Sequence, residues 1–265
     1  MCIANPPAAP PSGKGANDPT KRTKTQCKKC WREDYEKEIS VNPYGRYNES
    51  YWPLGISHGY FRTVQYKIFV HLKALNTVVV KVRFKMNPLT GVSDADAKAA
   101  KIKMTKGVNT YWNKNNFNLE VDDPLCGKKT LSIRYKVAWV TSGQHYTVNL
   151  YNTYPKRENV AGNIMKVQKS TDEWIYAHEF AHCVGLPDEY SYTKFTETVK
   201  YYKPDGSLDA AISAPPLKPQ NAPDASIMSS KYNTNKMKRH AWNIAIEVQE
   251  LLRKKLGREI KCSIK

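Results

Sequence analysis

The sequence predicts an α+β fold, and three patterns support this prediction. First, residues 61–72 and 76–86 alternate apolar and polar side chains, as half-buried strands do, with a turn near Asn76. Second, the segment after Asn87 and Pro88 carries apolar residues at helical spacing. Third, residues 234–256 place apolar side chains on one helical face and lysines and arginines on the other, which predicts a C-terminal helix.

Each run has its own boundary signals. In residues 76–86, the apolar side chains Val78, Val80, Val82 and Phe84 share one face, and Lys81, Arg83 and Lys85 share the other. Ser93 and Asp96 predict the N-cap of the helix that follows, which extends to about Asn113. The expected buried stripe of that helix is Ala97, Ala100, Met104, Val108, Tyr111 and Trp112. Of the C-terminal helix, we expect Met237, Ile244, Val248, Leu251 and Leu252 to face inward.

The middle of the chain alternates strands with turns. Further strands are expected at residues 117–121, 131–140, 145–151 and 161–168. Ser170 and Glu173 then predict a capping box that opens a second helix. After Tyr190 we expect a long irregular region, because it is rich in proline and small residues.

Composition divides the chain into three regions. Residues 1–25 hold five prolines without periodicity, which predicts a flexible arm. Residues 26–75 begin with a loop-rich, aromatic lead-in, and we expect them to pack on the main domain as an extension. Alternatively, this extension crosses the functional cleft, as in a latent zymogen. Residues 76–265 are expected to form the main domain.

The most informative stretch is HEFAHCVGLPDEY, residues 178–190. His178 and His182 are four residues apart, so on a helix they share one face and suit one zinc ion. Glu179 is rotated by roughly 100° and can take a proton from water at the open position of the metal. Gly185 allows a left-handed turn, and Pro187 prevents the helix from continuing. Asp188 then offers a third ligand.

These spacings are specific. A chance HExxH is expected in roughly one chain in a hundred of this composition, and adding Gly185 and Asp188 lowers this to roughly one in 100,000. The alternative is a buried helix with two hydrogen-bonded histidines and no metal. At these residues the chain resembles the metzincin clan of zinc endopeptidases, and it is most similar to snapalysin-type and immune-inhibitor-A-type bacterial peptidases.

The resemblance implies Zn²⁺ held by His178, His182 and Asp188, with Glu179 as general base and acid. It also implies a twisted, mostly parallel sheet and a methionine turn under the metal, for which Met228 in ASIMSS is the candidate. Glu189 is expected to point away from the metal, toward a supporting hydrogen bond or a surface partner.

The sequence departs from the metzincin pattern at one position. In several metzincins a tyrosine two residues after the turn methionine binds zinc or the oxyanion, but Ser230 stands there in this chain. Tyr232, Tyr190 and Tyr192 are the candidates for that role, and the sequence does not choose among them.

The charge of the chain bears on its partners. With 42 Lys and Arg against 24 Asp and Glu, the net charge is +18. This excess predicts affinity for polyanions, such as an acidic substrate or an anionic envelope surface, or else only a solubilising surface. No nucleic-acid motif accompanies it, so we expect no specific nucleic acid, and a monomer is expected.

Six cysteines allow several interpretations. The Cys27 and Cys30 pair fits half a zinc knuckle, a redox pair or a local disulfide, and we favour disulfides formed after export. The N-terminus does not read as a signal peptide, and no run approaches 18 apolar residues. Together these features suggest secretion by a dedicated machine, as for an antibacterial effector with a cognate immunity protein.

The function that the sequence predicts is a zinc-dependent endopeptidase acting on proteins or peptides. Two alternatives stay open. One is a hydrolase of peptidoglycan stem peptides with the same zinc site. The other is a basic, non-catalytic binding protein that zinc only stabilises.

Overall fold

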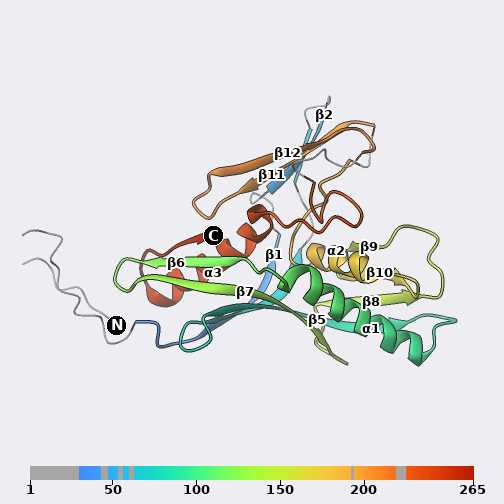
Figure 1. The fold of residues 1–265 in the computed structure, drawn as a ribbon, viewed down its shortest axis with the longest axis horizontal. Helices are drawn as coiled ribbons and strands as arrows, with labels where there is room; N and C mark the ends of the chain where they lie inside the picture. The colour runs from blue at the N-terminus through green and yellow to red at the C-terminus, as the bar shows by residue number, and fades with distance from the viewer. Residues whose placement is uncertain (1–29, 43–46, 53–55, 60–62, 192–193, 219–224) are drawn as a thin grey trace, which may run out of the picture.

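The computed structural model describes residues 30–42, 47–52, 56–59, 63–191, 194–218 and 225–265, and these form an α+β fold built on two sheets. Figure 1 shows the larger sheet in the lower part of the view and the smaller sheet at the top. The arm expected at residues 1–25 lies outside the described residues.

The larger sheet is mixed. Its nine strands are β1 (Tyr35–Val41), β4 (Val64–His71), β5 (Thr77–Pro88), β6 (Asn118–Asp123), β7 (Gly127–Trp139), β8 (Tyr146–Tyr151), β9 (Asn159–Ala161), β10 (Ile164–Gln168) and β13 (Lys261–Ile264). The central pairs β7–β5, β5–β8 and β8–β10 are parallel, whereas the outer pairs are antiparallel. The expected parallel character therefore holds at the centre of the sheet only.

The helices pack on the apolar face of this sheet. As predicted, the face of β5 with Val78 and Phe84 is fully buried, while its other face stays partly exposed. Helix α1 (Asp94–Val108) lies beside α2 (Glu173–Cys183), and α3 (Trp242–Leu256) covers the sheet near β1 and β13. A Cβ on Gly107 of α1 would lie 2.1 Å from the carbonyl oxygen of Glu173, so only glycine permits this close approach of α1 to α2.

Helix boundaries were predicted with mixed success. The capping box of Ser93 and Asp96 is confirmed, but α1 ends at Val108 and a π-helical turn (Asn109–Asn113) follows it. The expected buried stripe of α1 is confirmed except for Tyr111, which is only partly buried. The capping box of Ser170 and Glu173 was wrong, because Asp172 caps α2 by accepting a hydrogen bond from the Ile175 amide.

The C-terminal helix also begins later than predicted. A short 3₁₀ helix, η2 (Lys238–Ala241), precedes α3, which starts at Trp242 rather than at residue 234. Met237 is only partly buried, whereas the other four predicted inward residues are buried.

The expectation of a long irregular region after Tyr190 was wrong. Strands β11 (Thr196–Tyr202) and β12 (Leu208–Ala214) form a hairpin, and the Pro204–Ser207 segment is its turn. The hairpin pairs through β11 with β2 (Tyr47–Trp52), and β2 pairs with β3 (Ile56–Gly59). This partner lies far away in the chain, so local sequence did not reveal the sheet. The 26–75 segment thus supplies strands to both sheets.

A disulfide joins the segment before β1 to the turn between β6 and β7. Cys30 bonds to Cys126, 96 residues away, so Cys30 forms neither a local disulfide with Cys27 nor a zinc ligand. The thiols of Cys183 and Cys262 are buried in the core. Among the described residues, no helix has both the length and the apolar character needed to cross a membrane.

Candidate metal centre and active site

Helix α2 presents the two histidines of the motif on one face, and the chain then turns sharply. His178 and His182 are both buried, with ring centroids 4.9 Å apart. Gly185 adopts φ +98°, as the predicted left-handed turn requires, and a Cβ there would lie 2.7 Å from the Asn243 side chain. This turn directs Asp188 back toward the histidines.

Backbone carbonyls fix the protonation of both imidazoles. His178 Nδ1 lies 2.9 Å from the Ile227 carbonyl oxygen, and His182 Nδ1 lies 2.7 Å from that of Leu186. A carbonyl only accepts, so each Nδ1 carries the proton. In the neutral rings both Nε2 atoms are therefore lone-pair donors to a cation, which is the arrangement of histidine metal ligands.

Asp188 completes a set of three electron-pair donors. Its Oδ1 lies 3.0 Å from His178 Nε2 and 3.4 Å from His182 Nε2. Two ligands of one tetrahedral zinc lie about 3.3 Å apart, given bond lengths of about 2.0–2.1 Å. Lone pairs at this distance repel each other unless a proton or a metal ion lies between them, and the separations match those of two ligands on one metal ion.

The pKa values of His178 and Asp188 also show that positive charge is favoured in this cluster. Burial lowers the pKa of His178, but the hydrogen bond and charge of Asp188 more than offset this and raise it to about 9. Burial raises the pKa of Asp188, but the two histidines hold it well below its usual range. In the metal-free protein a proton therefore supplies the positive charge that the donors require.

Glu179 lies at the same centre, as the motif predicts. Its carboxylate is buried, and the ligand atoms of His178, Glu179 and His182 all lie within 4.8 Å of one another. It also lines both cavities that flank the cluster. A carboxylate in this position can exchange a proton with a water molecule beside the metal ligands.

The predicted methionine turn connects two parts of the centre. Met228 is fully buried, and the Ile227 carbonyl beside it is the group that holds His178. The Met228 carbonyl accepts a hydrogen bond of 2.8 Å from the amide of Glu189, next to Asp188. The turn therefore positions both His178 and the acidic loop through its backbone.

Glu189 points away from the histidines into a fully buried network. The guanidinium of Arg239 donates to both carboxylate oxygens, at 2.7 and 2.9 Å. Tyr201 and Ser226 donate to them as well, at 2.8 and 2.6 Å, and His240 Nε2 lies 3.2 Å away. Burial raises the pKa of Glu189, but these partners hold it well below its usual range.

The residues around Glu189 were not predicted from the sequence. Arg239 is one basic residue among 42, and its neighbours give no local sign that it is buried. Tyr201 belongs to the β11 hairpin, which was expected to be irregular. Ser226 belongs to the ASIMSS segment, but no role was predicted for it.

The candidate tyrosines differ in their distance from the histidines and in their exposure. Tyr190 lines both cavities and stacks on His178 with ring centroids 6.4 Å apart. Burial, then the charge of Asp188, raises the pKa of Tyr190, so its phenol stays protonated. Tyr232 is largely exposed and donates to Asp172 at the start of α2. Tyr192 lies outside the described residues.

The two cavities form the approaches to the centre. One, of about 560 Å³, is bounded by Trp174, Tyr190 and the Ser229–Lys231 segment. The other, of about 290 Å³, is bounded by His182, Asp188 and residues Asn159 and Val160 of β9. Among the described strands, β9 pairs only with β10, so no described strand pairs with its other edge, which lies beside His182 and Asp188.

Comparisons with protein-family models, with curated proteins and with solved structures found no match to this chain. The fold and the site therefore carry the functional argument alone.

Proposed function

We propose that this protein is a zinc-dependent endopeptidase. The observation that carries the proposal is the convergence of two imidazole Nε2 atoms on Asp188 Oδ1, at 3.0 and 3.4 Å, with the Glu179 carboxylate in the same cleft. A purely structural zinc site does not need that additional carboxylate.

The donor set favours zinc among the common metals. Two imidazoles and one carboxylate suit Zn²⁺, whereas Mg²⁺ and Ca²⁺ favour oxygen ligands. His178, His182 and Asp188 would hold the ion, which when bound makes water more acidic and polarises a carbonyl group.

The side chains of this chain perform the remaining tasks. Glu179 accepts the proton of the attacking water at its carboxylate and delivers it to the leaving amine nitrogen. The Tyr190 hydroxyl stays protonated and hydrogen-bonds Asp188, and in this proposal it turns to donate to the negatively charged oxygen of the tetrahedral intermediate. Trp174 and Tyr190 stack on His178 and restrict its ring.

A peptide substrate is favoured by the neighbouring strand. The free edge of β9 offers backbone hydrogen bonds to an extended chain, and Asn159 and Val160 line the cavity next to Asp188. A substrate bound there as an added strand would lie across the Glu179 carboxylate. The Cys30–Cys126 disulfide supports a working place outside a reducing cytosol.

The test compares Glu179→Ala with the unaltered protein at equal zinc content. We expect the rate of peptide-bond cleavage to fall by about two orders of magnitude or more, as for loss of a general base. Cleavage of a peptide library is followed by mass spectrometry with and without a chelator, and purified sacculi serve as a second substrate. Glu259→Gln, at an exposed carboxylate, is the matched control.

Unchanged cleavage in Glu179→Ala would contradict the mechanism. Cleavage of sacculi but not of the peptide library would redirect the proposal to peptidoglycan stem peptides. Zinc binding without hydrolysis of either substrate would favour the non-catalytic binding protein.

A further inference from the structure

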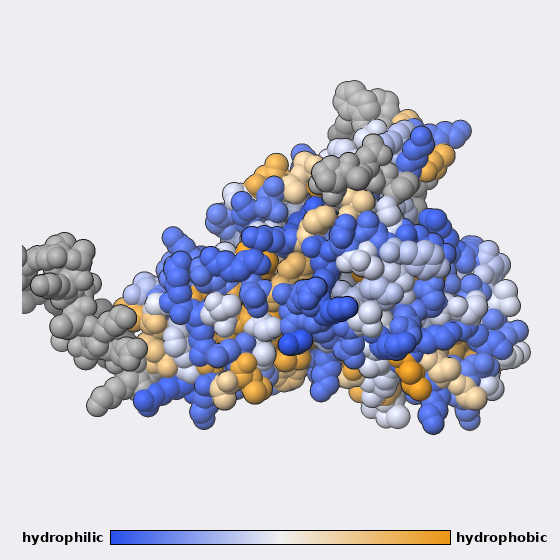
Figure 2. All heavy atoms as spheres, in the orientation of Figure 1, coloured by the Kyte–Doolittle hydropathy of each residue, from blue (hydrophilic) through white to orange (hydrophobic). Residues whose placement is uncertain are grey.

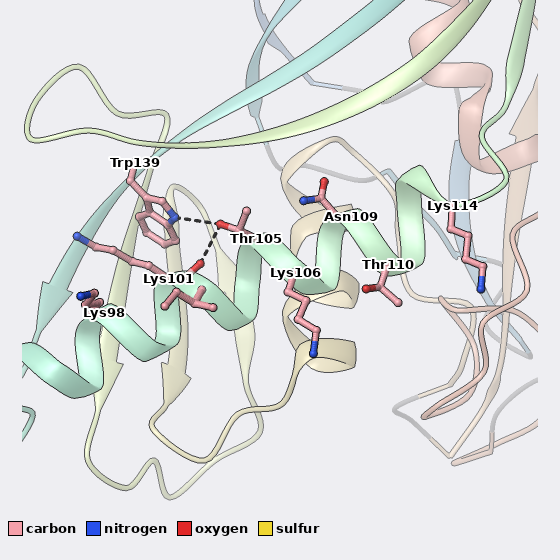
Figure 3. Close-up of a pocket in the computed structure, with 9 residues that line it drawn as sticks. Lys98, Lys101, Thr105, Lys106, Asn109, Thr110, Lys114 and Trp139 are labelled. Atoms are coloured by element: carbon pink, nitrogen blue, oxygen red, sulfur yellow. Dashed lines mark hydrogen bonds between the residues drawn. The ribbon is translucent and has the colours of Figure 1, made fainter.

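A second groove lies on the outer side of α1, and the proposed peptidase chemistry does not use it. Its volume is about 780 Å³, and α1, the π-helical turn and the end of β7 enclose it. Figure 3 shows its lysines spaced along the helix, with Trp139 beside Lys101. Hydrophilic residues cover most of the face in Figure 2, with hydrophobic residues in small groups.

The groove combines a positive rim with an apolar floor. Its rim carries Lys98, Lys101, Lys106 and Lys114, and none of the described residues that line it is acidic. Lys106 pairs with Glu173 at 2.8 Å, so three of these lysines supply the positive charge of the groove. Its floor holds Ile102, which is 58% exposed, and Trp139. The Lys101 ammonium lies 5.6 Å from the centre of the Trp139 ring. An exposed isoleucine between lysines suits a ligand that carries both carboxylates and an apolar side chain.

The adjacent strand adds a backbone recognition element. Strand β6 pairs with β7 only up to Ser132, and Asn113 bonds the backbone of Tyr135 through its side chain. Beyond that point, within the described part of the chain, β7 pairs only with β5. The opposite edge of the segment that ends at Trp139 therefore has backbone groups for an added strand.

The dimensions also fit a peptide. From Lys98 to Val108 the α-helical rise amounts to about 15 Å, which equals about four to five residues of extended chain, and the π-helical turn lengthens the groove toward Lys114. A bilayer surface would need several exposed apolar side chains, whereas among the residues lining this groove only Ile102 is a large, exposed aliphatic one. Single-stranded nucleic acid would need an open aromatic face, but Lys101 lies over the ring of Trp139.

We propose that this groove binds an acidic, extended polypeptide segment of a partner protein, with an apolar side chain over Ile102 and Trp139 and carboxylates facing the lysines. The groove is separate from the metal centre, so binding requires neither zinc nor cleavage.

Fluorescence anisotropy tests the proposal on the full chain in the Glu179→Ala background, which protects the probe from cleavage. The probe is a labelled decapeptide of glutamates with two central leucines. We expect Lys98→Glu/Lys101→Glu to raise its Kd about tenfold or more. Lys254→Glu/Lys255→Glu, at exposed lysines of α3, changes the net charge equally and should raise the Kd less than about twofold.

Ile102→Ser separates the apolar contact from the charge. It should weaken the leucine-containing probe several-fold and leave an all-glutamate decapeptide unaffected, because only the former uses the floor. Equal weakening by the two double variants would overturn the proposal, since net charge alone would then explain binding. Tighter, groove-dependent binding of oligothymidine, or of vesicles of equal parts phosphatidylserine and phosphatidylcholine, would also overturn it.

Discussion

Two neighbouring carboxylates, Asp188 and Glu189, enter two charged clusters of opposite character. Around Glu189 every partner is a donor or a cation, with Arg239 and Tyr201 among them, so the protein itself neutralises the carboxylate. Around Asp188 the partners are the Tyr190 hydroxyl and the Nε2 atoms of the two histidines, whose other nitrogens already donate to carbonyls. The protein itself neutralises the carboxylate of the first cluster, whereas the second could hold a metal ion.

This difference distinguishes a cluster that stabilises the fold from a cluster that could bind a ligand. A buried charge with a full set of partners holds the fold in one arrangement and offers nothing to a ligand. A convergent set of lone pairs is maintained only because the surrounding structure enforces it, which is typical of functional sites. The turn at Ser226–Ser229 joins the two clusters, because its backbone and side chains contact both.

The largest expected effect comes from breaking the complete cluster. Glu189→Ala leaves the Arg239 guanidinium buried without its counter-charge, which should cost on the order of 3–5 kcal/mol of unfolding free energy. Denaturant unfolding in the presence of a chelator measures this loss. Glu189→Gln keeps the size of the side chain and should lose less. An Ala variant as stable as the unaltered protein would show that the network does not hold the fold.

The second effect comes from the proposed metal site around Asp188. Asp188→Ala removes one of three ligands, so zinc should no longer raise the melting temperature. For the unaltered protein this stabilisation amounts to about 2.7 kcal/mol at a zinc concentration a hundred times the Kd. Without metal, Asp188→Ala should destabilise less than Glu189→Ala, because no buried arginine is left unpaired. Retained metal content after dialysis against a weak chelator would place the third ligand elsewhere.

The third effect is the pH dependence of the unfolding free energy, which should have opposite slopes without and with zinc. The pKa of His178 is raised to about 9, so its ion pair with Asp188 stabilises the metal-free protein fully below about pH 6.5. This stabilisation is lost as the pH rises through about 9, by on the order of 1–3 kcal/mol.

Zinc binding has the opposite trend, because the ion must displace the proton from His178, so the stabilisation by zinc should grow across the same range. Unfolding free energies between pH 6 and 9.5, with chelator and with zinc, check both slopes. Parallel slopes in the two conditions would mean that proton and metal do not compete.

Local patterns predicted the parts of the molecule that depend on local chemistry. The strands with alternating residues, the Ser93 cap and the turn at Gly185 depend on neighbours within a few positions, and all were confirmed. The spacing of the histidines and Asp188 likewise predicted that these side chains lie together.

The remaining features depend on distant partners. Strand β11 is stabilised by β2, about 150 residues earlier, and Cys30 pairs with Cys126 rather than with its neighbour. Arg239 reaches Glu189 across 50 residues, so no window of sequence reveals the contact. The position of Asp172 as cap of α2 was missed because Ser170 and Glu173 offered an equally regular pattern.

The smallest effect tests the turn that joins the two clusters. Its contributions to both come from the Ile227 and Met228 carbonyls and from the Ser226 hydroxyl, not from the methionine side chain. Met228→Leu nearly conserves volume in a fully buried position, so it should cost less than about 1.5 kcal/mol and leave the zinc stoichiometry near one. Ser226→Ala, which removes a buried donor to Glu189, should cost about 1–3 kcal/mol. Chemical unfolding measures the stability of both variants, and metal analysis measures their zinc stoichiometry. Loss of zinc from a folded Met228→Leu protein would show that the methionine side chain itself shapes the proposed metal centre.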